Sequence, residues 1–169
     1  GKYSLLDGME PFMTGGDTVS RTTYKTAEFL KPPEKFEAGL QNYAGAIGLA
    51  SAIDYIKNVG MKSIEKHQIG INIYATKLIS EIRGISILGP SAEQRSGILS
   101  FNLEGMDFHQ IALLMSEMNV MLRSGQHCVH SWFDARGMKG CVRASFYLYN
   151  TKEEVEKFAE GLKKIAKMR

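Results

Sequence analysis

The sequence predicts an α+β fold in which helices pack on a small sheet, preceded by an extended arm. Apolar residues recur at spacings of three and four over residues 43–82 and again after residue 151, which is the period of a helix buried on one side. Between residues 85 and 147, short apolar stretches are typical of strands. Residues 1–42 are rich in Gly and Pro and show little periodicity, which indicates loops and extended segments.

The region 43–82 divides into two predicted helices. The first begins at Tyr43 and stops at Gly60, because glycine commonly ends helices. The second ends before Gly84 and carries charged residues on its other faces. The apolar face of the first helix consists of Ala46, Leu49, Ile53 and Ile56, and that of the second of Ile64, Ile69, Ile71, Ile73, Tyr74, Leu78 and Ile82.

Two strands are predicted next, at residues 85–88 and 97–103, joined by a turn that contains Gly and Pro. The second strand places its apolar residues on one face, because strand side chains alternate. Asp107 is a suitable N-cap for a following helix, after which residues 120–123 are predicted to form a short strand. The residues expected to be buried in these elements are Leu99, Phe101, Leu103, Phe108, Ile111, Met115 and Met118.

The remaining residues are predicted to form a loop, a strand and a helix. A loop rich in Gly and polar residues covers residues 124–140, and a strand covers residues 141–147. Thr151 and Glu154 have the spacing of a capping box at the start of the last helix. That helix is expected to bury Val155, Phe158, Leu162 and Ile165.

These elements predict a division of the chain into two parts. Residues 61–169 form one compact α+β domain in which helices cover a small sheet. Residues 1–60 comprise the arm and the connecting helix. Since the arm cannot bury much surface by itself, we expect it to pack on a partner surface.

The composition argues against several classes of function. The 21 Lys and Arg nearly balance the 18 Asp and Glu, and the most basic stretch alternates with glutamates, so no nucleic-acid partner is expected. No apolar run approaches the roughly 18–20 residues that cross a bilayer, and no signal segment opens the chain. We therefore expect a soluble, cytoplasmic protein without a membrane partner. The Cys and His residues lack zinc-ligand spacing, so no metal site is expected.

The loop Arg123-Ser124-Gly125-Gln126-His127-Cys128 carries the strongest candidate for chemistry. It places a thiol beside an imidazole and near a guanidinium. Cationic neighbours favour the thiolate, which is the nucleophilic form of cysteine, and the glycine allows a tight turn. Cys128 is therefore a candidate nucleophile, while an inert buried cysteine remains the alternative for these residue types.

Arg143 is the second candidate, because it stands between the small apolar residues Val142 and Ala144 on a predicted strand. Its planar guanidinium suits a carboxylate or phosphate, and an ion pair within the chain is the alternative. Cys141 shares its strand face but has no cation or glycine turn beside it, so we interpret it as a small core residue. Together, Cys128 and Arg143 suggest a nucleophile near a carboxylate clamp.

Several strings of residues resemble successive blocks of cysteine desulfurases and selenocysteine lyases. These are enzymes of the class V aminotransferase family and of fold type I, and they depend on pyridoxal 5'-phosphate. The resemblance covers essentially the whole chain and implies the C-terminal half of such an enzyme, with the end of its large domain in residues 1–60 and its small domain in residues 61–169. The strings are Pro11-Phe12 with Gly15-Gly16-Asp17, Phe36-Glu37-Ala38-Gly39 with Asn42, Arg123 to Cys128, and Arg143-Ala144-Ser145 with Tyr149-Asn150.

The resemblance implies roles for single residues. Cys128 matches the cysteine that takes sulfur from the substrate as a persulfide while alanine leaves, and His127 matches an assisting residue beside it. The loop is most similar to the SufS-like branch, in which Arg-x-Gly-His-His precedes the nucleophile. Arg143 matches the arginine that binds the substrate carboxylate, and Arg123 matches a flanking residue of the same site.

The resemblance also implies a cofactor and partners. Gly39 and Asn42 match residues that contact the cofactor across a homodimer. The substrate is cysteine or selenocysteine, and a sulfur acceptor protein and a role in iron–sulfur cluster assembly follow from the family. Leu40 stands where the family usually has a phosphate-binding Thr, and Gln126 replaces the first loop histidine.

No lysine of the sequence lies in the Ser-x-His-Lys-like setting that surrounds the Schiff-base lysine of the family. We therefore expect the chain to be inactive without a lysine-bearing N-terminal half or partner chain, as a fragment or as a subunit of a split enzyme. Two alternatives stay open. One is another class V aminotransferase or carbon–sulfur lyase in which Cys128 is incidental, and the other is a non-catalytic sulfur-transfer or assembly subunit that accepts persulfide on Cys128.

Overall fold

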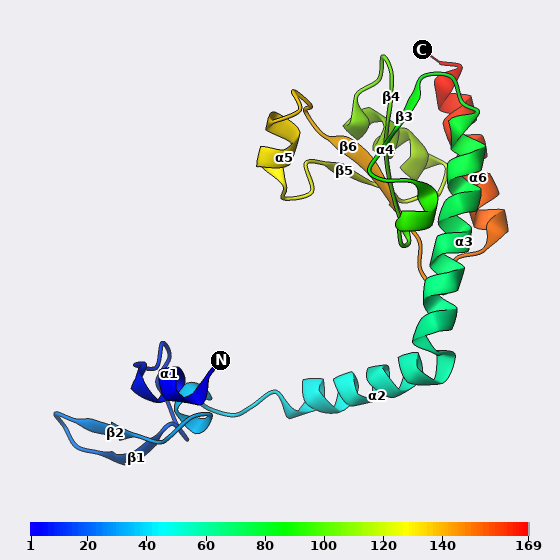
Figure 1. Cartoon of the computed structure of the whole chain (residues 1–169). Coiled ribbons are helices and arrows are strands. Elements are labelled where there is room, and N and C mark those ends of the chain that lie inside the picture. The colour runs from blue at the N-terminus through cyan, green and yellow to red at the C-terminus, as the bar shows by residue number, and fades with distance from the viewer. Residues whose placement is uncertain (169) are drawn as a thin grey trace. The chain divides into compact units, whose positions relative to one another are not determined.

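The computed structural model describes residues 1–168, and the chain divides into two compact units (Figure 1). The first unit consists of residues Gly1–Ile56, and the second starts at Lys57. This division falls inside a helix. The domain boundary expected after residue 60 stays a prediction.

The first unit contains a short helix, a two-stranded hairpin and most of a longer helix. The expectation of only loops and extended segments in residues 1–42 is wrong for the short helix. It is one turn and a half long, so it shows no periodicity, and the backbone N–H groups of Leu5 and Leu6 close it on the carbonyl of Lys2. The elements are α1 (Tyr3–Gly8), β1 (Val19–Thr22), β2 (Ala27–Phe29), the 3₁₀ turn η1 (Glu34–Phe36) and α2 (Tyr43–Val59).

Helix α2 forms where the sequence predicts it, yet none of its residues is buried. Leu49 and Ile53, which are neighbours on its predicted apolar face, are 62% and 42% exposed. A row of apolar side chains without cover favours association with another surface, because burying such side chains is favourable. The partner surface expected for this part of the chain stays a prediction.

The second unit is built on a four-stranded antiparallel sheet in the order β3-β4-β6-β5. This arrangement confirms the predicted α+β fold. The elements are α3 (Met61–Ser80), β3 (Ile85–Leu88), η2 (Ala92–Gln94), β4 (Ile98–Leu103), α4 (Phe108–Glu117), β5 (Arg123–Gly125), α5 (His130–Asp134), β6 (Cys141–Ser145) and α6 (Lys152–Ala166).

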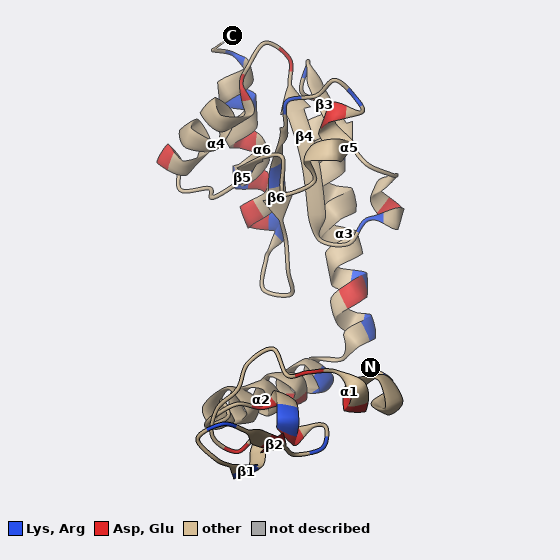
Figure 2. Cartoon of the chain, turned by 90° about the vertical axis from the view of Figure 1, so that its left-hand side faces the viewer, with Lys and Arg blue, Asp and Glu red and all other residues tan. Residues whose placement is uncertain are grey.

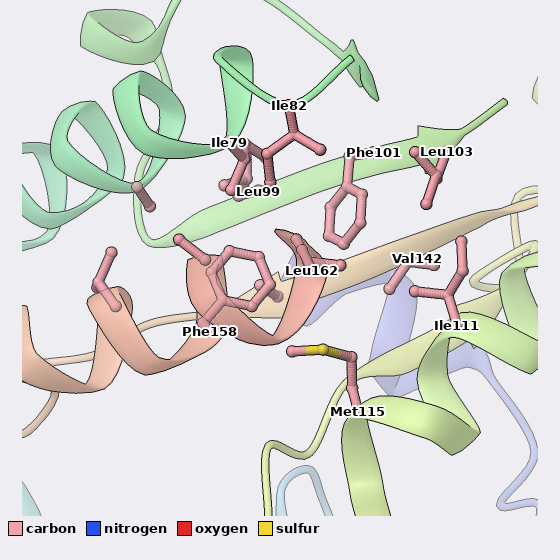
Figure 3. Close-up of a cluster of buried hydrophobic side chains, with 14 of the residues drawn as sticks. Ile79, Ile82, Leu99, Phe101, Leu103, Ile111, Met115, Val142, Phe158 and Leu162 are labelled. Carbon is pink, nitrogen blue, oxygen red and sulfur yellow. The ribbon is translucent and has the colours of Figure 1, made fainter. Parts of the chain in front are cut away.

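One face of this sheet is the core of the unit, and α3, α4 and α6 cover it (Figure 3). Phe101 of β4 packs edge-on against Phe158 of α6, with ring centroids 5.8 Å apart. The alternation predicted for β4 is confirmed. Side chains at the centre of the core, all at most 2% exposed, include Leu99, Phe101, Leu103, Ile111, Met115, Val142, Phe158 and Leu162.

Both predicted helix caps are present. The Asp107 side chain accepts hydrogen bonds from the backbone N–H groups of His109 and Gln110. At the start of α6, Thr151 and Glu154 form the reciprocal bonds of a capping box. These caps satisfy backbone donors that a helix leaves open at its N-terminus, so a local sequence signal was enough to find them.

The strand expected at residues 120–123 is wrong, because β5 is Arg123–Gly125. The N–H of Val120 donates to the carbonyl of Met115 and so completes the end of α4, and pairing with β6 starts only at Arg123. The loop expected at residues 124–140 contains α5 as well as most of β5. A five-residue helix is too short to stand out by periodicity among polar residues.

The buried face of α3 also differs in part from the expectation. Ile73 is 39% exposed, whereas Asn72 is fully buried. The Asn72 amide donates to the carbonyls of Ser96 and Ile98, at 2.6 and 2.8 Å. These bonds hold the backbone at the start of β4 against α3. The apolar period of the helix does not identify Asn72, because the burial of a polar side chain depends on hydrogen-bond partners from another segment.

Basic and acidic residues are interspersed along the chain in both units (Figure 2). In α6, Glu153 and Glu154 lie in the first turn and Lys163 and Lys164 in the last, which is the favourable arrangement for the helix dipole. Across residues 1–168, every helix is too short or too polar to cross a bilayer.

The packing of Phe158 gives a test of this core. We expect Phe158→Ala to lower the free energy of unfolding by about 3–5 kcal/mol, because it leaves a cavity between Phe101 and Phe146. Tyr149→Ala is the control, since Tyr149 is 72% exposed and its loss should cost less than about 1 kcal/mol. Urea unfolding followed by circular dichroism measures both. Equal losses in the two variants would contradict the assigned core.

Candidate functional site

The candidate site lies on the face of the sheet opposite the core. Strand alternation turns Ser100 of β4 and Arg143 of β6 away from the helices, and these two residues are register partners. Helix α5 lies on this side of the sheet, away from α3 and α6 (Figure 1). Residues of β4, β6 and α5 line an open pocket of about 370 Å³. Its walls are Leu88, Gly89, Ile98, Ser100, His127, Val129, Trp132, Phe133, Cys141 and Arg143.

Two arginines face each other at the edge of this sheet. Arg123 of β5 and Arg143 of β6 are directly opposite in the antiparallel register, and like charges in that position repel. The Nε of Arg143 is buried without a hydrogen-bond partner, and no carboxylate of residues 1–168 forms an ion pair with either arginine. These facts favour an anionic ligand for Arg143 over an ion pair within the chain.

The backbone turns sharply at the candidate nucleophile. His127 and Cys128 have φ values of +51° and +62°, in the left-handed region that non-glycine residues rarely adopt. The N–H of Val129 donates to the carbonyl of Gln126 at 2.9 Å and closes this turn. Left-handed backbone costs about 1–2 kcal/mol per residue, and such strain clusters at functional sites. The side chain of Cys128 is exposed, between two residues that line the pocket.

His127 is held in an unusual state. Both of its ring nitrogens are buried without a hydrogen-bond partner. Burial lowers the pKa of His127 below the ordinary imidazole value, and the positive charge of Arg143 lowers it further. The Cys141 backbone raises this pKa by less than either of them lowers it, and Arg123 has the smallest effect, which also lowers it. The imidazole is therefore neutral at neutral pH, and it can accept or release a proton at the pocket.

Cys141 is buried, as the sequence predicts, but it lines the pocket and is not part of the main core cluster. Burial raises the pKa of the Cys141 thiol, although the Ser100 hydroxyl and Arg143 act in the opposite direction. This cysteine therefore stays a thiol at neutral pH. The environment distinguishes the two cysteines, because one is an enclosed thiol and the other is exposed on a strained turn.

Sequence reasoning missed the aromatic wall of the pocket. Trp132 and Phe133 of α5 pack edge-on, with ring centroids 5.0 Å apart, and the Arg136 guanidinium lies 4.1 Å from the Trp132 ring centroid. With Val129, they have the spacing i, i+3, i+4 of one helix face. This spacing is a sequence signal for the helix α5, although residues 124–140 as a whole were expected to form a loop.

Gly39 and Asn42, the residues expected at the cofactor, lie in the first unit and not in this pocket. Gly39 has a φ of +76°, and its N–H donates to the carbonyl of Gly16. The Asn42 Oδ1 accepts a 2.9 Å hydrogen bond from the N–H of Gly45, in the first turn of α2. The pocket thus contains His127 and Arg143. Arg123 is the register partner of Arg143, and Cys128 follows His127 in the chain, whereas Gly39 and Asn42 belong to the first unit.

Residues 1–158 match the family model of class-V aminotransferases. The chain belongs to this family. It is similar to a probable cysteine desulfurase of Halobacterium salinarum, with 38% identity over 156 residues that cover 92% of this chain and 38% of the relative. A cysteine desulfurase of Haloferax volcanii is 36% identical over 162 residues, which cover 96% of this chain and 38% of that protein.

The chain is also similar to solved structures of cysteine desulfurases. The apo cysteine desulfurase of Thermococcus onnurineus is 35% identical and superimposes with a TM-score of 0.89, over 98% of this chain and 42% of that protein. The class-V aminotransferase chain thus spans about two fifths of the length of its relatives. The fold type implied by the sequence resemblance is confirmed.

Gly140, where the chain enters β6, offers a test of the site's framework. A Cβ at this position would lie 2.8 Å from Phe108 Cζ and 3.0 Å from the Gly125 backbone, and the φ of Gly140 is +155°. We expect Gly140→Ala to lower the free energy of unfolding by about 2–4 kcal/mol. Gly137→Ala is the matched control, because Gly137 also has positive φ but has no other atom near its Cβ position. Thermal unfolding measures the stability of both variants. Equal losses of stability would show that the close approach of Phe108 and Gly125 to Gly140 is unimportant.

The lowered pKa of His127 gives a second test. Because unfolding restores the ordinary pKa, the unfolded chain binds a proton that the folded chain does not, in the pH range between the two values. Stability should therefore be complete above the ordinary value of about 6.5 and decline as the pH falls through it. We expect His127→Gln to lose less stability than the parent between pH 7.5 and 5.5, as measured by urea unfolding. An NMR titration midpoint of His127 at or above 6.5 would contradict this account.

Proposed function

We propose that this chain is the part of a cysteine desulfurase that carries the sulfur-accepting thiol and the carboxylate clamp of the substrate. One observation carries the proposal. His127 and Val129, the two neighbours of Cys128, line the same pocket as Arg143, whose buried Nε lacks a hydrogen-bond partner within residues 1–168. The similarity to proteins described as cysteine desulfurases supports the same conclusion.

The two arginines would bind the substrate through its carboxylate. A guanidinium pairs with a carboxylate through two parallel hydrogen bonds, and the negative charge offsets the repulsion between Arg123 and Arg143. The Nε of Arg143 is itself buried beside apolar side chains, so water would screen this ion pair less than one at an open surface. Cysteine and selenocysteine share this carboxylate, so the proposed clamp serves either amino acid.

The sulfur transfer follows from the position of Cys128. Its thiolate attacks the substrate sulfur, the S–S bond of a persulfide forms, and the C–S bond of the substrate breaks. The electron pair of that bond stays on carbon, which takes up a proton and leaves as alanine. His127 is neutral and lies at the pocket, so it is a suitable proton carrier for this step. The exposure of Cys128 suits release of the sulfur to an acceptor protein, and iron–sulfur cluster assembly is the proposed use.

Pyridoxal 5'-phosphate would supply the electron sink for this reaction. The residues of this chain suit a contact with its phosphate, because the positive end of the helix dipole of α2 lies at Tyr43, directly after Gly39 and Asn42 in the chain. Leu40 is 88% exposed and adds no donor. We infer that the Schiff-base lysine and the remaining contacts come from a lysine-bearing partner or N-terminal part, in a dimer-type assembly.

The decisive experiment measures alanine release from cysteine by the chain assembled with its lysine-bearing part and pyridoxal 5'-phosphate. We expect Cys128→Ser to lower the rate by more than about 100-fold, because the hydroxyl is a far weaker nucleophile than the thiolate. Ser131→Ala is the control, since Ser131 is an exposed residue of α5, three positions after Cys128, and its replacement should leave the rate unchanged.

Other results identify the alternatives. Undiminished turnover by Cys128→Ser indicates a carbon–sulfur lyase or aminotransferase in which the thiol is incidental. Persulfide on Cys128 that arrives from another protein, without cofactor and without alanine release, indicates a sulfur-transfer subunit.

A further inference from the structure

The loop that carries Cys128 is attached to the sheet at two neighbouring points. It leaves after β5 and returns at Gly140, and the two ends lie side by side because Gly125 pairs with Cys141. Both ends contact side chains of one other segment, residues 102–109, which connects β4 with α4. This segment is not part of the pocket wall.

His109 contacts the first end of the loop. Its Nδ1 and the Ser124 hydroxyl share a hydrogen bond of 2.9 Å, and its ring lies close enough that a Cβ at Gly125 would be 3.8 Å from Cε1. The position of His109 is fixed in turn, because its backbone N–H donates to the capping carboxylate of Asp107 at 2.8 Å. The cap of α4 and the strand β5 are thereby connected through one imidazole.

Asn102 and Phe108 contact the second end. The Asn102 amide donates to the carbonyl of Gly140 at 3.0 Å. The Phe108 ring fills the space where a side chain at Gly140 would stand, and it also lies against the His109 ring, with centroids 4.5 Å apart. The same segment therefore holds the chain just before and just after the loop.

This attachment matters because β5 is weakly held by the sheet itself. It is three residues long and lies at the edge of the sheet, so few ladder bonds hold it to β6. Repulsion between Arg123 and Arg143 acts against that pairing, and the strained turn at His127 and Cys128 follows within three residues. A separate attachment is needed to keep this strand in register.

We propose that Asn102 and His109 are positioning residues for the Cys128 loop. His109 holds β5 through Ser124, and Asn102 holds Gly140. Their combined effect keeps Arg123 opposite Arg143 and keeps Cys128 at the rim of the pocket. The attachment follows from the geometry alone, whereas its value for sulfur transfer rests on the proposed function.

Hydrogen exchange of the chain tests the attachment without requiring activity. We expect Ser124→Ala and His109→Ala each to speed amide exchange in residues 123–129 by about two- to tenfold, which is the effect of losing one hydrogen bond. Since both variants remove the same bond, the double variant should exchange no faster than His109→Ala, which also removes the ring contact with Phe108. Ser124→Thr keeps the hydroxyl and should restore slow exchange.

Ser80→Ala is the matched control, because the Ser80 hydroxyl is exposed and bonds only within its own helix. Unchanged exchange of residues 123–129 in both His109→Ala and Ser124→Ala would overturn the proposal. So would equal acceleration by Ser80→Ala, or failure of Ser124→Thr to restore the parent rate.

Asn102 is tested in the same way at the other end of the loop. Asn102→Ala should speed exchange of the amides that follow Gly140, and combination with His109→Ala should produce a larger change, because the two bonds hold different ends. In the assembled enzyme, Ser124→Ala should lower kcat/KM for cysteine by a similar factor, with Ser124→Thr close to the parent. Altered exchange without any alanine release would disprove the proposed function and leave the attachment standing.

Discussion

Strand β6 is the constraint on which the rest of the second unit depends. Val142 and Ala144 are buried in the core beneath the helices, and this alternation turns Cys141 and Arg143 to the opposite face. A shift of one residue in register would exchange the two sets and place a guanidinium in the core. The burial of a few small apolar side chains therefore determines where the Arg143 guanidinium stands.

The features of the pocket oppose stability and are maintained by their surroundings. Two arginines face each other, an imidazole is buried without partners, and two consecutive residues have left-handed backbone. Each of these features has a free-energy cost, which the packed core offsets. Such a concentration of unfavourable groups around one exposed thiol is expected where a ligand supplies the missing partner.

Family membership and the pocket account for complementary parts of the protein. The class-V aminotransferase family and the similarity to cysteine desulfurases establish the framework over nearly the whole chain. The pocket shows which groups of this chain lie together on the free face of the sheet. Helix α2 has no buried residue, and its large apolar side chains are exposed.

The sequence by itself determined the elements whose signals are local. The apolar periods of α3 and α6, the alternation in β4, and the caps at Asp107 and Thr151 depend on residues within a few positions of each other. The loop from Arg123 to Cys128 was recognisable as a motif for the same reason. Its isolated cysteine and arginine suggested chemistry, but not which groups would share one pocket.

Only the tertiary structure decided which polar residues are buried, where β5 pairs and which groups form the pocket. These features depend on contacts between segments that are distant in the sequence. The burial of Asn72 requires carbonyls more than twenty residues away, and the position of β5 requires His109 and β6. The aromatic wall of the pocket forms when α5 folds over the sheet face of Arg143. A sequence lists these groups without their neighbours, and the neighbours decide whether a polar group is buried, paired or left open for a ligand.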